Sequence, residues 1–225
     1  MRQPKRLVAL FAVLWLLLGS YIDNVEADST DLPVLADAPV PNNLKPTLSL
    51  IKNDRPTPYK DRCHVQQNLI ASNNPCVYGD LNSKTTIVLF GDSHALSWFP
   101  AIERLALAKH WKLLSLTMSS CWPADIPAYN PKTKTTMDNC GLWRKNTLDQ
   151  ILNINPSWIF VTGTKGFATT NQSGDLAVEP DRTTIWQAGM TRTLQSLKAA
   201  SSRVIYIGDT PNSIFDVPTC LAANL

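Results

Sequence analysis

Histidine is scarce in this chain of 225 residues, which contains only His64, His94 and His110. No histidine follows residue 110, so the second half of the chain has no imidazole to serve as a base or a metal ligand. The sequence also lacks a Gly-x-Gly-x-x-Gly fingerprint, a P-loop, a calcium loop and any internal repeat. These absences argue against a dinucleotide-, nucleotide- or calcium-dependent protein, and we expect no cofactor.

Strong charge of one sign is absent as well. The formal net charge is +3, and the basic residues are scattered along the chain. Nucleic-acid-binding domains instead gather Lys and Arg on one face or along one helix. We therefore expect no nucleic-acid partner.

An apolar run opens the chain at residues 7–18, after three positive charges. The run is shorter than the roughly 20 residues that a spanning helix needs, and its length suits the core of a signal peptide. Residues 25–27, Val-Glu-Ala, offer a cleavage site, whereas residues 19–22 extend the run into a plausible anchor. In either case residues 1–22 are expected to export the rest of the chain to the periplasm.

The composition changes after this segment. Residues 23–61 are rich in Pro, Asp and Asn and have no sustained apolar period, which is typical of an extended linker. Residues 62–225 are long enough for one domain with a core of its own.

Short apolar runs alternate with helical patterns in that domain. We expect strands at 85–90, 111–118, 157–163 and 203–208, and helices at 95–110, 141–155 and 181–201. Alternating strands and helices imply parallel pairing, and right-handed crossovers then give a three-layer α/β/α sandwich. The loops that follow the strands should meet at one edge of the sheet.

The first strand of the domain runs directly into Gly91-Asp92-Ser93-His94. Ser93 therefore lies at the carboxyl end of a strand, where open α/β sheets bind ligands and where a tight turn exposes a hydroxyl beside free backbone N–H groups. A catalytic nucleophile requires such an exposed hydroxyl and such N–H groups. The alternative is an ordinary turn in which Asp92 or Ser93 caps the next helix.

Gly91-Asp92-Ser93-His94, with a strand before it and Ala-Leu-Ser-Trp-Phe-Pro-Ala after it, resembles block one of the SGNH hydrolase superfamily. The resemblance is closest to the SGNH domain of acyltransferase family 3 membrane proteins and runs from about Cys63 to Leu225. It implies that Ser93 is the nucleophile and that its backbone N–H is an oxyanion donor. The family also places a transmembrane helix before this domain, which favours an uncleaved anchor.

Two further blocks of the superfamily are altered here. Residues 119–123, Ser-Ser-Cys-Trp-Pro, occupy the place of the block-two glycine. Residues 163–166, Gly-Thr-Lys-Gly, stand at the third block but lack its asparagine, as is common in acyltransferase-linked SGNH domains. The residues expected around the pocket are Asp92, His94, Ser120, Gly163 and Thr164.

The superfamily takes its base from an Asp-x-x-His block near the carboxyl end, and this sequence contains no such block after the fourth strand. The chain is therefore expected to be truncated and to turn over slowly. His94 directly follows Ser93, so its side chain should diverge from the serine and form a pocket wall rather than the base. His64 and His110 are expected to be a structural contact and a solvent-facing residue.

Asp92-Ser93-His94 also fits the Asp-x-His opening of metallophosphoesterases. Those enzymes need several further ligands, including an Asn-His pair, and none occurs here. A site with two ligands lacks the coordination that such metals require, so no metal is expected.

Five cysteines in an exported chain point to disulfides, because the periplasm is oxidising. Local pairing gives Cys63–Cys76 and Cys121–Cys140 and leaves Cys220 outside both pairs. The sequence cannot separate this connectivity from the others that five cysteines allow.

These observations predict an exported SGNH-type O-acyltransferase or esterase that moves an acyl group, acetyl by preference, to or from a cell-envelope glycan. A membrane protein that donates the acyl group would be its partner. Trp98, Trp122 and Trp143 could stack on sugar rings, although each could equally belong to the core. The alternative is a non-catalytic remnant or a glycan-binding module.

Overall fold

The computed structural model describes residues 43–201, 203–210, 213 and 215–223. Residues 43–222 form one compact unit. The expected signal or anchor segment at 1–22 and the linker up to residue 42 lie outside the described residues. None of the helices in the described part is long and apolar enough to cross a membrane.

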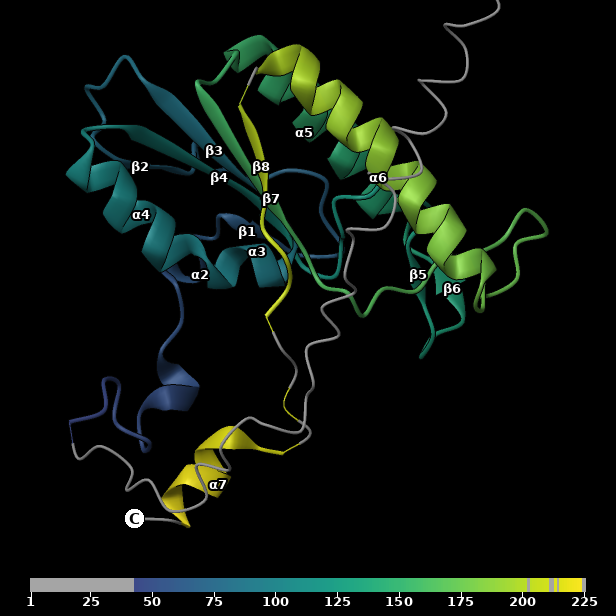
Figure 1. Ribbon diagram of the computed structural model, residues 1–225, viewed down its shortest axis with the longest axis horizontal. Helices are drawn as coiled ribbons and strands as arrows, with labels where there is room; N and C mark the ends of the chain where they lie inside the picture. The colour runs from purple at the N-terminus through teal and green to yellow at the C-terminus, as the bar shows by residue number, and fades with distance from the viewer. Residues whose placement is uncertain (1–42, 202, 211–212, 214, 224–225) are drawn as a thin grey trace, which may run out of the picture. The chain divides into compact units, whose positions relative to one another are not determined.

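A single central sheet organises the domain (Figure 1). Its main path is β1 (His64–Val65), β4 (Lys112–Met118), β3 (Thr86–Gly91), β7 (Trp158–Thr162) and β8 (Val204–Tyr206), all in parallel pairs. The four strands expected from the sequence are present. The sheet is not wholly parallel, however, because β2 (Val77–Gly79) pairs antiparallel with the amino-terminal half of β4.

Helices cover both faces of the sheet. On one face lie α3 (Ser93–Ser97) and α4 (Phe99–Ala108), and on the other lie α5 (Asp138–Ile154) and α6 (Asp181–Ala200) (Figure 1). The sequence predicts one helix over 95–110, which is wrong, because the structure breaks it at Trp98. Pro100 sits in the first turn of α4 and has no N–H to continue the preceding helix.

The smaller elements were not expected from the sequence. They are the 3₁₀ turn η1 (Ile51–Asn53), α2 (Thr57–Lys60), the hairpin of β5 (Tyr129–Asn130) and β6 (Thr135–Thr136), and α7 (Val217–Ala222). Each is two to six residues long, which is too short to show a hydrophobic period.

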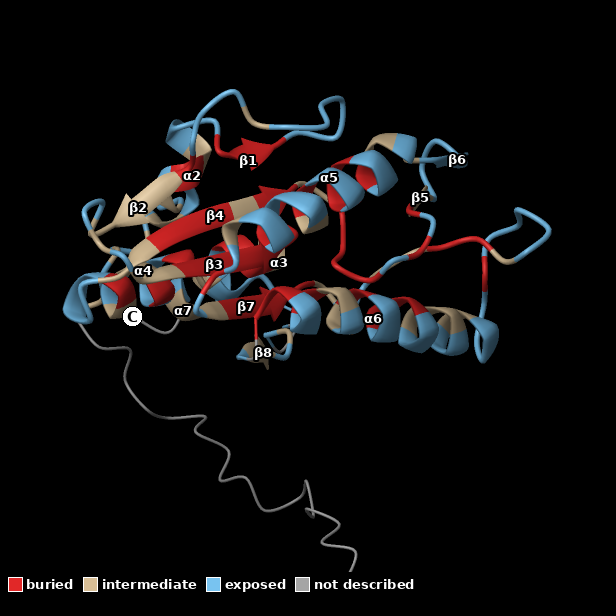
Figure 2. Ribbon diagram, turned by 90° about the horizontal axis from the view of Figure 1, so that it is seen from above, coloured by how far each residue is buried: buried red, intermediate tan, exposed pale blue. Residues whose placement is uncertain are grey.

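Two apolar cores lie on the two faces of the sheet, and β3 supplies both. Ile87 and Leu89 pack with α3 and α4, whereas Val88 and Phe90 pack on the side of α5 and α6. This alternation follows from the two-residue period of a strand. Figure 2 shows β3, β4 and β7 as buried strands between exposed helix faces.

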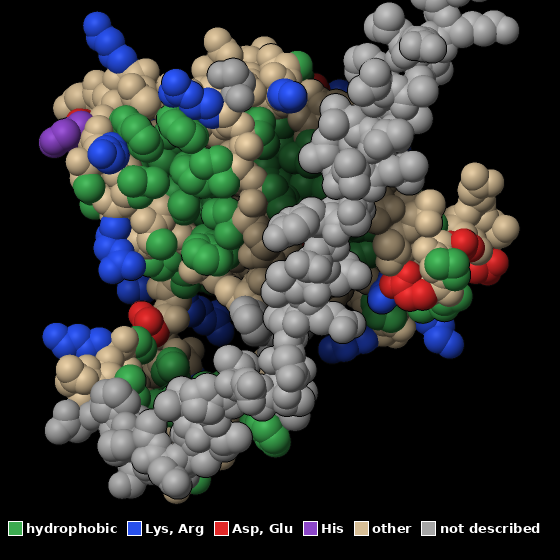
Figure 3. All heavy atoms as spheres, in the orientation of Figure 1, with side chains coloured by type: hydrophobic (Ala, Val, Ile, Leu, Met, Phe, Trp, Pro, Cys, Tyr) green, Lys and Arg blue, Asp and Glu red, His purple; other side chains and the backbone are tan. Residues whose placement is uncertain are grey.

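The core on the side of α4 is only partly covered. Trp111, Trp158, Ile205 and Ile207 pack against it but are not fully buried. Figure 3 shows hydrophobic side chains gathered on the face that carries α4.

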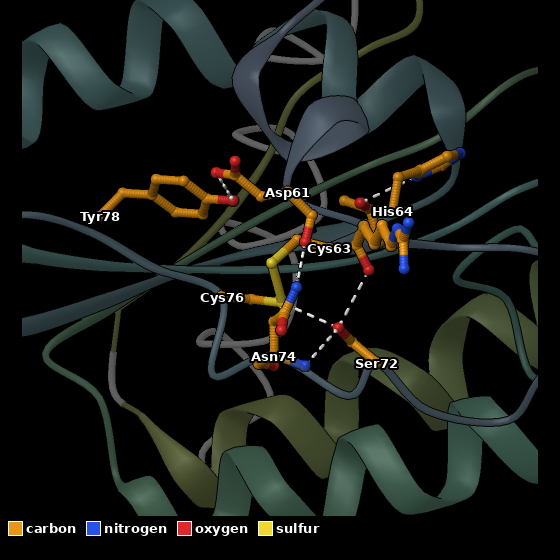
Figure 4. Close-up of a disulfide and its surroundings, with 9 residues drawn as sticks. Asp61, Cys63, His64, Ser72, Asn74, Cys76 and Tyr78 are labelled. Carbon is orange, nitrogen blue, oxygen red and sulfur yellow. Dashed lines mark hydrogen bonds between the residues drawn. A yellow bond between two sulfur atoms is a disulfide. The ribbon is translucent and has the colours of Figure 1, made fainter.

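Two disulfides join segments at the edge of the sheet, and both local pairings expected from the sequence are confirmed. Cys63 pairs with Cys76 and Cys121 with Cys140. Around the first pair, Ser72 Oγ donates to Arg62 O and accepts from Asn74 N–H, which ties the connecting loop together (Figure 4). Cys220 lies in α7 and is exposed.

Candidate active site

Gly91 is the last residue of β3, and its lack of a side chain lets the strand end close to β7. Gly91 has a φ of +151°, and a Cβ at this position would overlap the carbonyl oxygen of Thr162 on the neighbouring strand β7. No residue with a side chain fits without moving β3 away from β7. Gly91, the first residue of the Gly-Asp-Ser-His motif, is therefore required for the packing of β3 against β7.

Ser93 is the first residue of α3 and is half-buried. Its hydroxyl makes no hydrogen bond with any described residue, and its backbone N–H has no acceptor among them either. A free hydroxyl and a free N–H at a helix amino terminus suit a nucleophile that also contributes to an oxyanion hole.

Asp92 lies beneath this turn and is fully buried. Its Oδ1 accepts from the N–H groups of His94 (2.8 Å) and Ala95 (3.4 Å), and its Oδ2 accepts from the N–H of Thr164 (2.8 Å). Burial raises the pKa of Asp92, while the hydrogen bonds and His94 act in the opposite direction. Asp92 therefore caps α3 and holds the loop after β7 against the turn that carries Ser93, which corrects its expected place in the pocket wall.

The loop after β4 places Ser120 in the left-handed region, with a φ of +54°. Glycine adopts this conformation most readily, so the loop must hold the side-chain-bearing Ser120 in it. Ser119 N–H donates to Val65 O (2.8 Å), and Cys121 is held by its disulfide. The loop is thus fixed on both sides of Ser120, whose own N–H has no acceptor among the described residues.

Gly163 follows β7 and is buried. A Cβ on it would lie 2.6 Å from Pro123 Cδ and 3.3 Å from Asp92 Oδ2, so only glycine fits between the two loops. Thr164 points its Oγ1 back to the N–H of Gly166 (2.9 Å). Gly163 thus shapes the loop by its lack of a side chain, and the hydroxyl of Thr164 is used within the loop.

His94 has a partner that the sequence did not suggest. Its Nδ1 lies 2.6 Å from Oδ1 of Asp209, in the loop after β8, and Asp209 Oδ2 accepts from Lys165 N–H (2.9 Å). The side chain of Asp209 is 5% exposed and that of His94 is 38% exposed. Burial opposes ionisation of Asp209, but the hydrogen bonds from Lys165 and His94 outweigh it and lower the pKa of this carboxyl.

The other two histidines lie elsewhere. His64 is buried in β1, where its Nδ1 is 3.0 Å from Thr117 Oγ1 and its ring packs edge-on to Tyr59. Burial lowers its pKa to about 4. His110 follows α4 and is 85% exposed.

An open cleft of about 650 Å³ borders the loop of Ser120. Figure 1 places the β5–β6 hairpin beside the amino-terminal end of α6, and residues of both line the cleft. The ring of Phe167 stacks on that of Trp186, with 6.0 Å between the centroids, and lies beside Trp122. The guanidinium of Arg182 lies over the same Phe167 ring. The polar and charged lining residues are Gln67, Ser120, Tyr129, Asn130, Lys132 and Arg182.

Of the three tryptophans considered from the sequence, Trp122 alone lines this cleft. Trp143 is buried and stacks on Phe90 in the core, and Trp98 packs into the core beside α4.

The model of the SGNH domain fused to AT3 domains matches residues 62–225. The chain belongs to this family. Among solved structures, the periplasmic domain of a lipopolysaccharide acetyltransferase from Salmonella ser. Paratyphi A is similar at 20% identity with a TM-score of 0.43. The similarity covers 59% of this chain and 47% of that one, so the chain spans about half of the acetyltransferase domain. No curated protein matches the chain.

Within the described ranges, no three side chains of His, Cys, Asp or Glu gather in a group that could hold a metal ion.

Proposed function

We propose that this SGNH domain transfers an acyl group to or from a hydroxyl of a cell-envelope saccharide through Ser93. The observation that carries the proposal is that the hydroxyl of Ser93, at the carboxyl end of β3, makes no hydrogen bond within the described residues, and that two N–H groups on the same edge of the sheet have no acceptor there. One is the N–H of Ser93 itself and the other that of Ser120. Family membership agrees with this chemistry.

The reaction would proceed in two displacements. Ser93 Oγ attacks the carbonyl carbon of the donor ester, the C–O bond to the donor alcohol breaks, and the acyl group remains on Ser93. A saccharide hydroxyl, or water in an esterase, then attacks the acyl-serine and releases Ser93. Each attack passes through an oxyanion that the N–H groups of Ser93 and Ser120 would stabilise.

The cleft beside Ser120 is the proposed acceptor site. The faces of sugar rings stack on aromatic side chains, and Phe167, whose ring stacks on Trp186, lines the cleft. Hydroxyl groups of the sugar would bond to the polar lining side chains, among them Asn130 and Tyr129.

The setting of the reaction is part of the proposal. Acetyl is the favoured acyl group, with a membrane protein as its donor, and residues 1–22 would hold the domain at the membrane or export it to the periplasm. The two disulfides fit an oxidising compartment.

A fluorophosphonate probe and p-nitrophenyl acetate test the nucleophile directly. The full chain should be labelled at Ser93, and Ser93→Ala should lose both labelling and esterase activity. Ser196→Ala, which removes a half-buried hydroxyl on α6, is the matched control and should behave as the unchanged chain. Equal rates for the chain and for Ser93→Ala would remove Ser93 from the chemistry and favour a glycan-binding module.

A further inference from the structure

A second cavity, smaller than the acceptor cleft, lies between α5 and the loop that precedes β2. Its volume is about 130 Å³, which is roughly ten times the volume that one water molecule needs. Residues of α5 line one side of this cavity, and residues 70–76 line the other. A space of this size suits a single sugar ring, and the proposed chemistry of Ser93 makes no use of it.

The loop side of the cavity is held in place by the fold itself. The Cys63–Cys76 disulfide closes the base of the loop (Figure 4). Near the start of the loop, Asn139 Nδ2 of α5 donates to Gln67 O at 3.2 Å. The cavity is therefore preformed, as ligand sites commonly are.

Two buried polar groups of α5 reach the cavity without a partner. Trp143 is 3% exposed and Thr147 is 4% exposed, and both line the cavity from neighbouring turns of the helix. Trp143 Nε1 and Thr147 Oγ1 make no hydrogen bond with any described residue, yet neither belongs to the polar atoms that the fold seals from solvent. These two groups therefore face the cavity, where the hydroxyl groups of a ligand would pair with them.

The lining of the cavity favours a neutral ligand rich in hydroxyl groups. None of the described residues that line it carries a charge. Asn146 and Gln150 lie exposed on the α5 side, and Asn74 lies on the loop side. Each amide supplies both donors and an acceptor, as sugar hydroxyls require, and Ile70 adds an apolar surface for the C–H groups of the ring.

We propose that this cavity is a second saccharide subsite, which binds a neutral sugar unit of the glycan held in the acceptor cleft. The inference rests on the proposed function for the identity of that glycan. Gln67 lines the acceptor cleft and Ile70 lines the cavity. Three residues of chain span no more than about 11 Å, so one oligosaccharide can reach both sites. The domain would then recognise a chain of sugar units and not a single sugar.

Nuclear magnetic resonance of the indole N–H groups tests the subsite without any turnover. The full chain carrying Ser93→Ala is titrated in turn with glucose, galactose, mannose and N-acetylglucosamine. At least one of these neutral sugars should shift the signal of Trp143 Nε1–H, because this group faces the cavity. Trp143→Phe identifies the signal by its disappearance.

Three variants show whether the shift comes from this cavity. Asn146→Ala and Thr147→Val each remove a hydrogen-bonding group and should raise the Kd of that sugar by roughly 2–10-fold. Asn153→Ala, which lies exposed on α5 and does not line the cavity, is the matched control and should leave the Kd unchanged.

A filled cavity and a charged sugar make the test sharper. Ala71→Leu places a larger apolar side chain at the cavity and should remove the sugar-induced shift, while the indole signals of the other tryptophans keep their positions. Glucuronic acid should bind more weakly than glucose, because its carboxylate would lose water without gaining a charged partner.

No shift of the Trp143 signal with any of the four sugars would overturn the proposal. A shift that survives Ala71→Leu, with a Kd that Asn146→Ala leaves unchanged, would also overturn it, since another site would then bind the sugar. Tighter binding of glucuronic acid than of glucose would refute the neutral ligand. Failure of the proposed function looks different, because fluorophosphonate would then label Ser93→Ala as fast as the unchanged chain, whatever the Trp143 signal does.

Discussion

His64 joins β1 to β4 in its neutral form, and acid should weaken this junction. The ring is 4% exposed, lies 3.0 Å from Thr117 Oγ1 and packs against Tyr59. Burial lowers its pKa from 6.5 to about 4, because the charged form loses its hydration inside the protein. Protonation of His64 therefore favours the unfolded chain.

The size of the effect follows from the two pKa values. Because the folded value lies below the unfolded one, the contribution of His64 to stability is complete above about pH 6.5 and is lost as the pH falls toward 4. Proton linkage gives a loss of about 2 kcal/mol at pH 5 and about 3 kcal/mol at pH 4. Such a loss is a large part of the stability of a domain this size.

Urea unfolding at pH 7.5 and pH 5 measures this loss. The variant His64→Gln has no group that titrates at this position. Between pH 7.5 and pH 5 its free energy of unfolding should therefore fall by about 2 kcal/mol less than that of the unchanged chain. His110→Gln controls for removal of an exposed imidazole and should lose as much stability as the unchanged chain. If His64→Gln loses as much as well, His64 is not the group that acid charges.

Two other substitutions test the packing of the site and the acceptor cleft. Gly91→Ala should destabilise the domain by roughly 4 kcal/mol or more in urea unfolding, because the new Cβ would overlap Thr162 O. A loss of stability below about 1 kcal/mol would contradict the close approach of β3 and β7. Phe167→Ala should raise KM for a saccharide acceptor while the fluorophosphonate labelling of Ser93 is unchanged, and an unchanged KM would exclude Phe167 from the acceptor site.

The main strands could be predicted because their signal is local. Residues 86–91 and 112–118 are short apolar runs, and such runs form buried strands whatever their tertiary partners. The antiparallel β2 could not be predicted in the same way. It has three residues, none of them fully buried, and it forms because the Cys63–Cys76 disulfide and the edge of β4 hold it in place.

The division of α3 from α4 was open to prediction, since Pro100 is visible in the sequence. A proline removes the hydrogen bond to the carbonyl four residues earlier, here that of Leu96, and a helix rarely runs through it unchanged. The apolar pattern over 95–110 continues across the break because both helices pack on the same face of the sheet. Periodicity therefore identifies the buried face but does not reveal a change of axis within it.

Some features of the candidate site depend on neighbouring residues in the sequence, and others depend on residues far apart in it. The position of Ser93 at the end of β3 and the cap formed by Asp92 follow from four consecutive residues. The role of Asp209 depends on a contact across 115 residues, which no local pattern encodes. The available signal was its position directly after the fourth strand, because parallel strands bring their carboxyl ends to one edge. A carboxylate at that position belongs beside the turn that carries Ser93, and the imidazole of His94 within that turn is the group it can orient.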